Sequence, residues 1–325
     1  MKYVISKVLV AGVSLLAFFE QPHTNVSQPN GILGRAVAWN LEKADFTVTL
    51  LTRDVVKTRT AFPGFKAIQS NYRSVEELVH TLRSECGAQD ALVILINRDQ
   101  TDAQIRLMKA ASEAGIAHII PSAFGIGTRD PFIRSLPVLQ SKVMMEDFVV
   151  QEAEAGKFTF TGIQTGAFLD YALAEGILFN TEGTEKATPI YDLGDTSFSA
   201  TIISDIGKAT AAALTKFDEF RNRWIFVHSA VITQNQILTY ARASCPTRNF
   251  HTFKLSTAEM AQEAWARYKS GERSLEVTRL FTPLSRFAYG LGLFQETQNN
   301  ILGIRLCTED DLRALVARYA NPQDV

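Results

Sequence analysis

The chain has 325 residues, of which 46% are hydrophobic and 21% are charged, a composition typical of a globular protein with a substantial core. Its formal net charge of −1 gives no electrostatic reason to expect nucleic acid or an anionic membrane as a partner. Its three cysteines, Cys86, Cys245 and Cys307, show no metal-ligand spacing, and an odd number fits a reducing compartment better than a disulfide framework. We therefore expect a cytoplasmic protein without a metal site.

The first predicted strand, residues 7–12, is followed by an interrupted nucleotide-binding pattern. Removal of residues 13–28 would join KVLVAG to PNGILGRAVAWNL and give a G-x-x-G-x-x-G sequence. Such glycines permit a tight strand-to-helix turn, close approach of a pyrophosphate, and close packing of the helix on the sheet. We therefore expect a dinucleotide's phosphates at this helix N-terminus. The residues expected to bind them are Gly12, Asn30, Gly31, Ile32, Leu33 and Gly34.

The segment 13–28 has three interpretations. Its Val-Ser start and Gln end are what a short retained intron with ordinary splice sites would encode, and its removal keeps the reading frame. A genuine loop insertion is the second interpretation. The third is a secretory signal, because VLVAGVSLLAFF has the length of a signal-peptide core, but Phe18–Gln21 offers no small-x-small cleavage site. We favour the retained intron.

Apolar runs and helical patterns alternate through the first half of the chain. The predicted strands are 7–12, 46–52, 65–70, 91–96, 117–121 and 158–163, and the predicted helices between them are 32–44, 74–85, 101–115 and 138–156. This alternation is typical of the α/β class with a doubly wound parallel sheet of the Rossmann-like type, which binds ligands beyond the carboxyl ends of its strands. We therefore expect an NAD(P)-binding domain over residues 1–160.

The pattern loosens after that domain. It predicts strands at 198–203 and 224–229 and helices at 205–215, 234–243, 256–270 and 309–319, with Asp205 as an N-cap. This mixture predicts a smaller C-terminal α+β substrate lobe over residues 161–325, partly interleaved with the first domain. The Phe-rich stretch 280–294 fits the roof of an aromatic pocket, the lobe core or the surface of a homodimer.

One charged residue bears on the choice of cofactor. Arg53 lies 19 residues after Gly34, where an acidic residue would hold the ribose 2′-hydroxyl of NAD. An arginine there suits the 2′-phosphate of NADP, because its guanidinium group can donate hydrogen bonds to two phosphate oxygens at once. Asp54 follows immediately, so NAD stays open.

A second charged residue, Lys142, lies in the predicted helix 138–156. Leu139, Val143, Met144 and Phe148 recur beside it at helical spacing and predict a buried stripe. A lysine at the edge of such a stripe can reach into a cleft, but the spacing alone favours a solvated helix lysine.

Several segments together resemble the NmrA-like family, and within it the isoflavone-reductase-like and phenylpropanoid reductases, which are atypical short-chain dehydrogenase/reductases. They are the G-x-x-G-x-x-G remnant, Thr-Arg after the second strand, AGIAHIIPSAFG with the lysine-bearing helix, TGIQTGAFLDYAL and SATIISDIGKATAAAL. The last two are similar to fungal members. The resemblance covers nearly the whole chain apart from residues 13–28.

This resemblance implies an NADPH-dependent reductase that transfers hydride to a small, often aromatic or conjugated substrate. Lys142 matches the lysine that contacts the nicotinamide ribose and assists proton transfer, and Ser122 and Phe124 would lie beside the nicotinamide. The substrate side would be lined by Phe124, Gln164, Thr165, Gly166 and Phe168. Two alternatives stay open: a dinucleotide-binding redox regulator without catalysis, and an isoform whose cofactor binding is impaired by residues 13–28.

Overall fold

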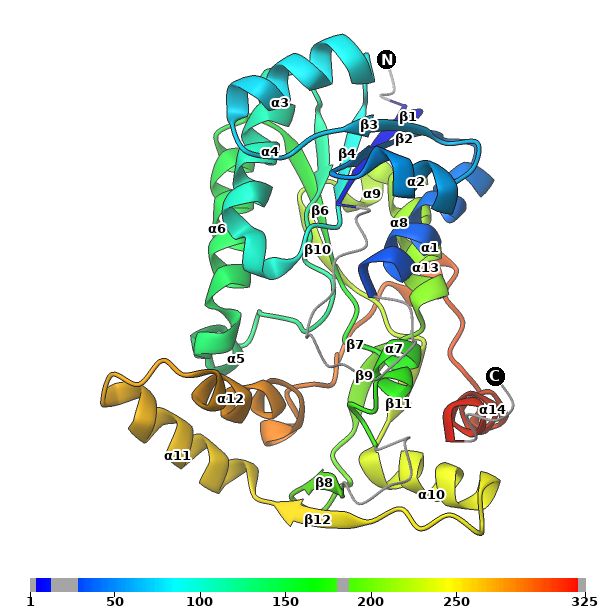
Figure 1. Ribbon diagram of the computed structural model, residues 1–325, viewed down its shortest axis with the longest axis vertical. Helices are drawn as coiled ribbons and strands as arrows, with labels where there is room; N and C mark the ends of the chain where they lie inside the picture. The colour runs from blue at the N-terminus through cyan, green and yellow to red at the C-terminus, as the bar shows by residue number, and fades with distance from the viewer. Residues whose placement is uncertain (1–3, 13–28, 180–186, 321–325) are drawn as a thin grey trace.

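A seven-stranded parallel sheet forms the centre of the larger lobe (Figure 1). The computed structural model describes residues 4–12, 29–179 and 187–320, so the segment 13–28 and its three interpretations lie outside the described residues. The strand order is β10-β6-β5-β4-β1-β2-β3, and every neighbouring pair is parallel. The strands are β1 Lys7–Ala11, β2 Thr47–Thr52, β3 Lys66–Gln69, β4 Ala91–Ile94, β5 His118–Ile120, β6 Thr159–Gln164 and β10 Arg223–Phe226. The predicted doubly wound sheet is confirmed.

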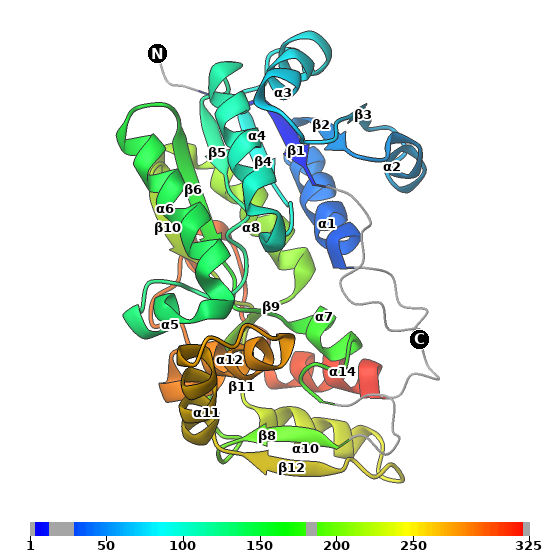
Figure 2. The ribbon, with the colours of Figure 1, turned by 60° about the vertical axis from the view of Figure 1, so that its left-hand side comes forward.

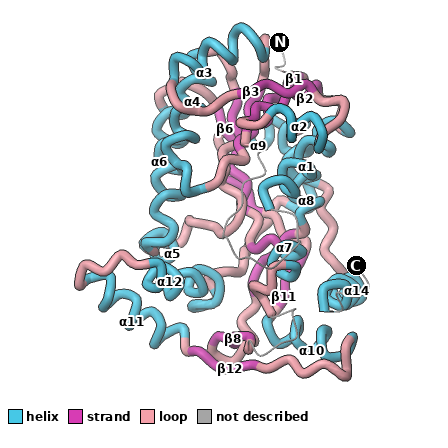
Figure 3. The backbone as a smooth tube through the Cα atoms, in the orientation of Figure 1, coloured by secondary structure: helices cyan, strands magenta, loops and turns pink. Residues whose placement is uncertain are grey.

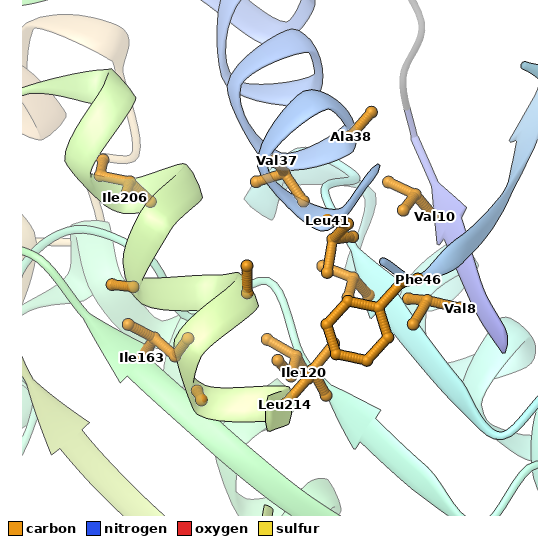
Figure 4. Packing of buried hydrophobic residues seen from close by; sticks show 14 of the residues in the cluster. Val8, Val10, Val37, Ala38, Leu41, Phe46, Ile120, Ile163, Ile206 and Leu214 are labelled. Atoms are coloured by element: carbon orange, nitrogen blue, oxygen red, sulfur yellow. The ribbon is translucent and has the colours of Figure 1, made fainter. Parts of the chain in front are cut away.

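Helices cover both faces of this sheet (Figure 3). One face packs against α1 (Pro29–Lys43) and α8 (Ile203–Thr215), with Val8 and Val10 of β1 buried beneath Val37 and Leu41 of α1 (Figure 4). The other face packs against α3 (Val75–Thr81), α4 (Thr101–Glu113) and α6 (Gln140–Glu154). This two-sided burial explains why the whole of β4 is apolar and buried. Shorter helices, α2 Val55–Ala61, α5 Pro131–Ser135, α9 Phe217–Phe220 and α13 Asn299–Leu302, connect or flank these layers.

Helices α1 and α8 pack closely because α8 carries a glycine, Gly207, at their contact. A Cβ atom on Gly207 of α8 would lie 2.3 Å from the carbonyl oxygen of Ala36 in α1, which is well inside van der Waals contact. The expected N-cap role of Asp205 is wrong, because α8 begins two residues earlier, at Ile203. The Ile203 amide instead donates to the carboxylate of Asp170, at 3.1 and 3.2 Å, and Asp205 pairs with Lys208.

The smaller lobe lies below the large sheet in Figures 1 and 2. It contains a three-stranded sheet in the order β11-β9-β7 and a two-stranded parallel sheet of β8 and β12. These strands are β7 Ala167–Phe168, β8 Thr188–Tyr191, β9 Phe198–Thr201, β11 Ala230–Ile232 and β12 Thr252–Leu255. The helices around them are α7 Leu169–Ala174, α10 Gln234–Ser244, α11 Thr257–Lys269, α12 Leu275–Phe287 and α14 Glu309–Ala320. Because β10 returns to pair with β6, the two lobes interleave along the chain.

The Phe-rich stretch 280–294 contains most of α12, and its place decides between the interpretations left open. Phe281 and Leu284 are fully buried and pack with Met260 and Ala264 of α11. This part of the stretch therefore belongs to the core of the smaller lobe. Its last helical turn also reaches the cavity described next.

Candidate active site

A cavity of about 340 Å³ opens beyond the carboxyl ends of β4, β5 and β6, between the two lobes. In a doubly wound sheet this edge, next to the switch in strand order between β1 and β4, is where ligands bind. The cavity brings together several predicted site residues from distant segments. They are Leu33, Ser122, Phe124, Lys142, Gly166 and Phe168.

The turn after β1 requires a glycine. Gly12 has φ = +88°, and a Cβ atom there would lie 2.5 Å from the backbone nitrogen of Ile96, which follows β4. The Gly12 amide donates to the carbonyl oxygen of Leu51 and to the hydroxyl of Tyr72, each at 3.3 Å. The Tyr72 hydroxyl donates in turn to Leu51 at 2.6 Å. The chain therefore passes very close to β4 at this point, as the first glycine of the predicted motif demands.

The N-terminal part of α1 carries the other two predicted glycines, Gly31 and Gly34. Leu33 lines the cavity and Gly34 is buried, so the first turns of α1 lie at the cavity edge. The side chains of residues 29–32 lie outside the described part of the structure, and with them the predicted contacts of Asn30 and Ile32.

Arg53 and Asp54 follow β2 and differ in what they contact. The Asp54 carboxylate caps α2, where it accepts from the Lys57 amide at 3.0 Å. Arg53 is half-buried and does not line the cavity. Since the carboxylate is engaged as a helix cap, the arginine is the residue of this pair that remains available to a ligand.

Lys142 is a buried residue, with 6% of its surface exposed, and the solvated position favoured by its spacing is wrong. Its Nζ donates to the carbonyl oxygens of Ala123 at 2.7 Å and Ile126 at 2.5 Å. The predicted buried stripe is wrong at Met144, which is 57% exposed. Helix α6 instead buries Lys142, Val143, Met145, Glu146 and Val149, because it packs against the loop after β5 as well as against the sheet.

Glu146 lies one helical turn after Lys142 and is equally buried, with its Oε1 3.8 Å from the lysine Nζ. It also accepts a hydrogen bond from the hydroxyl of Thr128 and one from Gln164 Nε2 at 3.2 Å. A buried carboxylate is tolerated when such donors and a nearby cation compensate it. The network fixes Glu146 beneath the lysine.

This network also includes two residues of the predicted substrate wall. Gln164 and Thr165 do not line the cavity. The Gln164 amide is bound to Glu146 and Thr128, and the Thr165 hydroxyl accepts from the Gly125 amide at 2.9 Å. Both side chains are therefore occupied in joining the ends of β5 and β6.

Sequence reasoning missed three polar residues of the cavity: Asn97, Tyr171 and Arg286. Asn97 follows β4 at the same sheet edge as Ser122, which is a signal that the chain order offered. Tyr171 lies in the segment 161–173 that carried the family resemblance. Burial, together with the nearby Glu175, raises the Tyr171 pKa to about 12, so its hydroxyl stays protonated at neutral pH. Arg286 comes from α12, in the Phe-rich stretch 280–294 that was one candidate for the roof of a pocket, but nothing in that stretch singled out the arginine.

No group of three or more His, Cys, Asp or Glu side chains in the described ranges is arranged to hold a metal ion. No helix in that part of the chain is both long and apolar enough to cross a membrane.

The fold and the cavity define a Rossmann-like α/β protein with a cavity at the switch point of its sheet, where such folds bind ligands. The sequence model of the NmrA-like family matches residues 25–245, and the chain belongs to this family. Among curated proteins, oxidoreductase poxI of Penicillium oxalicum is 29% identical over 65% of this chain and 66% of its own length. Oxidoreductase aprR of Aspergillus flavus is 27% identical over 61% of this chain and 65% of its own. The chain thus spans just under two thirds of these relatives.

Solved structures with the same fold cover the chain more fully. The complex of leucoanthocyanidin reductase with NADPH from Vitis vinifera has a TM-score of 0.72 at 17% identity, over 97% of this chain and 99% of its own. AtPrR2 with NADP+ and (+)pinoresinol has a TM-score of 0.70 at 16% identity, over 97% of this chain and 100% of its own. An isoflavone reductase gives 0.69 at 16% identity over 99% and 100%. At such identities the likeness shows the fold alone.

Proposed function

We propose that this chain is an NADPH-dependent reductase that transfers hydride to a small aromatic or conjugated substrate. The observation that carries the proposal is the buried Lys142, held next to Ser122 and Phe124 in the cavity at the strand ends. The curated relatives are named oxidoreductases, and two of the similar solved structures contain NADPH or NADP+.

The residues around β1 and β2 fit a dinucleotide. Because Gly12 has no Cβ, the chain turns tightly against the residues after β4 as it leaves β1, which is what the first glycine of a dinucleotide motif permits. The N-terminus of α1 would offer its free amides to the phosphates. Arg53 would bind the 2′-phosphate, since Asp54 is engaged as the cap of α2. This argument favours NADP over NAD.

The remaining residues would orient the substrate and move a proton. The bound cofactor would supply the hydride. Phe124 and Phe168 would pack against an aromatic or conjugated substrate in the cavity. Lys142 would deliver the proton from Nζ, whose position is set by the carbonyl groups of Ala123 and Ile126. Its burial would keep bulk water away from the transfer.

The first test is cofactor binding, measured by fluorescence quenching on the full chain. We expect NADPH to bind more tightly than NADH, and Arg53→Ala to weaken NADPH binding by about 10-fold while leaving NADH little changed. The exposed Arg59 of α2 provides a matched control, and Arg59→Ala should bind both cofactors as the wild type does. Failure of the wild type to bind NADPH would overturn the proposal.

The second test separates catalysis from binding. Lys142→Met should weaken NADPH binding by no more than about 10-fold, through the lost ribose contact, but lower the rate of NADPH oxidation by about 10²- to 10⁴-fold, the usual contribution of a positioned acid. The assay is substrate-dependent loss of NADPH absorbance with a panel of aromatic enones. Tight NADPH binding with no turnover across the panel, and indifference to Lys142→Met, would instead identify a dinucleotide-binding regulator.

A further inference from the structure

Arg286 reaches the cavity from the smaller lobe, in the last turn of α12. The helix is fixed by Phe281 and Leu284, which are fully buried in the lobe core. The chain after the helix folds back against it, since a Cβ on Gly292 would lie 2.2 Å from the carbonyl oxygen of Arg286. The backbone of Arg286 is therefore held from both sides.

The guanidinium group has no carboxylate partner among the described residues. Its Nε is buried and has no hydrogen-bond partner in the described part of the chain. Its recorded neighbours are aromatic, with the rings of Phe198 and Phe287 centred 5.9 and 5.8 Å from Cζ. Burial lowers the pKa of Arg286 to about 10, so the group is still a cation at neutral pH.

The charged residues in the described lining of the cavity are all positive. Arg286 and Lys142 are the charged residues among its described lining, and no aspartate or glutamate belongs to that lining. Glu146 pairs with Lys142 and does not line the cavity, so its carboxylate is not the partner of Arg286. The Arg286 side chain is half-buried and its Nε is buried, and a partly desolvated cation is stabilised when an anion joins it. Among the described residues no anion takes this position, which therefore suits the anionic group of a ligand.

The apolar part of the cavity indicates the chemical class of that ligand. Phe124, Phe168, Tyr171 and Ile177 contribute aromatic and aliphatic walls. A planar guanidinium fork matches the two oxygens of a carboxylate. We infer that the substrate is an aromatic or conjugated acid whose carboxylate is bound by Arg286. This inference rests on the proposed reductase function and adds to it the chemical class of the substrate.

The test compares acids with neutral isosteres on the full chain saturated with NADP+. The probes are cinnamic acid, 4-coumaric acid and 2-naphthoic acid, each paired with its primary amide, and binding is measured by saturation-transfer NMR competition. We expect the acids to bind at least about 10-fold more tightly than the amides. Arg286→Met should abolish this preference and Arg286→Lys should keep part of it. Equal binding of acids and amides, or a preference that survives in Arg286→Met, would overturn the inference.

Two further measurements distinguish this role from others. Arg286→Met should melt no lower than the wild type without ligand, because it removes a partly buried charge that has no carboxylate partner among the described residues. A large loss of stability would assign Arg286 to the structure instead. The exposed Arg279 lies on the same helix, and Arg279→Met should retain the acid preference.

NADPH affinity is measured for every variant. If Arg286→Met weakens NADPH binding and leaves acid binding unchanged, the anion at Arg286 is a cofactor phosphate and the inference fails. If the wild type binds NADPH without preferring acids, the inference fails while the proposed reductase function survives. If the wild type does not bind NADPH, the proposed function is what fails.

Discussion

Lys142 and Glu146 illustrate what a helical period can and cannot predict. Residues four apart share a helix face, so the sequence places these two side chains together. It does not show that this face is covered, because the cover comes from the Ala123–Ile126 segment after β5 and from Gln164 of β6. The family resemblance identified the lysine, whereas Glu146 became visible only through its partners on other elements.

His118 gives a prediction at the same scale. It is completely buried in β5, with Nδ1 3.0 Å from the Thr159 hydroxyl and Nε2 without a partner among the described residues. Burial, helped by the charge of Arg221, lowers its pKa from 6.5 to about 3. Between these values the unfolded chain binds a proton that the folded chain does not. Stability is therefore complete above the unfolded pKa and is lost as the pH falls towards the folded one.

We expect His118→Gln to reduce this loss. Between about pH 7.5 and about pH 4.5 the wild type should lose about 2–3 kcal/mol of unfolding free energy through this residue, measured by urea denaturation. Burial also lowers the pKa of His228, so a smaller loss of the same sign should remain in the variant. The exposed His80 is the control, and His80→Gln should keep the wild-type dependence. An unchanged dependence in His118→Gln would contradict the argument.

At the scale of elements, the contact between α1 and α8 depends on Gly207. Alanine usually favours a helix over glycine by about 1 kcal/mol, which alone would make Gly207→Ala stabilising. The added methyl group would lie 2.3 Å from the carbonyl oxygen of Ala36, and a backbone atom cannot rotate away. We expect the clash to win, with a net loss of about 1–3 kcal/mol in urea denaturation.

The neighbouring Lys208 provides a control on the same helix. Its side chain is 56% exposed and pairs with Asp205, so Lys208→Ala should change stability by less than about 0.5 kcal/mol. A Gly207→Ala variant as stable as the wild type would show that α1 and α8 can separate without cost.

Most elements that the sequence predicted belong to the regular alternation of apolar runs and helical patterns. All six strands predicted in the first half appear, as do the predicted helices between them, although β5 has only three residues. Several unpredicted elements lie outside this alternation: β7 has two residues and β11 three, and α12 contains Pro283. Asp205 was expected to cap α8 because it is a typical capping residue close to the true start. The carboxylate of Asp170, 33 residues away in the sequence, takes that position instead.

At the scale of the whole molecule, the segment 13–28 separates the first glycine of the nucleotide motif from the other two. Deleting it joins Gly12 directly to Pro29 and restores the G-x-x-G-x-x-G spacing. We expect the shortened chain to bind NADPH more tightly than the full chain. A ligand at about 100 times its Kd adds about 2.7 kcal/mol to stability, so NADPH should raise the Tm of the shortened chain further.

The measurement is a thermal melt of both chains with and without NADPH. Arg53→Ala in the shortened chain should reduce the rise in Tm that NADPH causes. This reduction would show that the stabilisation depends on the 2′-phosphate. A shortened chain that folds and shows no shift with NADPH would contradict the motif assignment.

The class of the large sheet, parallel and doubly wound, could be predicted from the sequence, since alternating strands and helices have few compatible arrangements. The strand pairing of the smaller lobe could not be predicted, because its sheets pair strands that are distant in the sequence, such as β8 with β12. The lining of the cavity could be predicted in part. Ser122 and Phe124 follow β5 at the sheet edge and were identified through the family resemblance, whereas Arg286 depends on how α12 packs.

The cavity wall from α12 is covalently remote from the glycine turn and the lysine helix, and its core contacts run through Phe281 and Leu284 on the side of α11. If the proposed reductase function holds, substitutions at the end of this helix should change which substrates bind while leaving the sequence of the glycine turn and of α6 untouched.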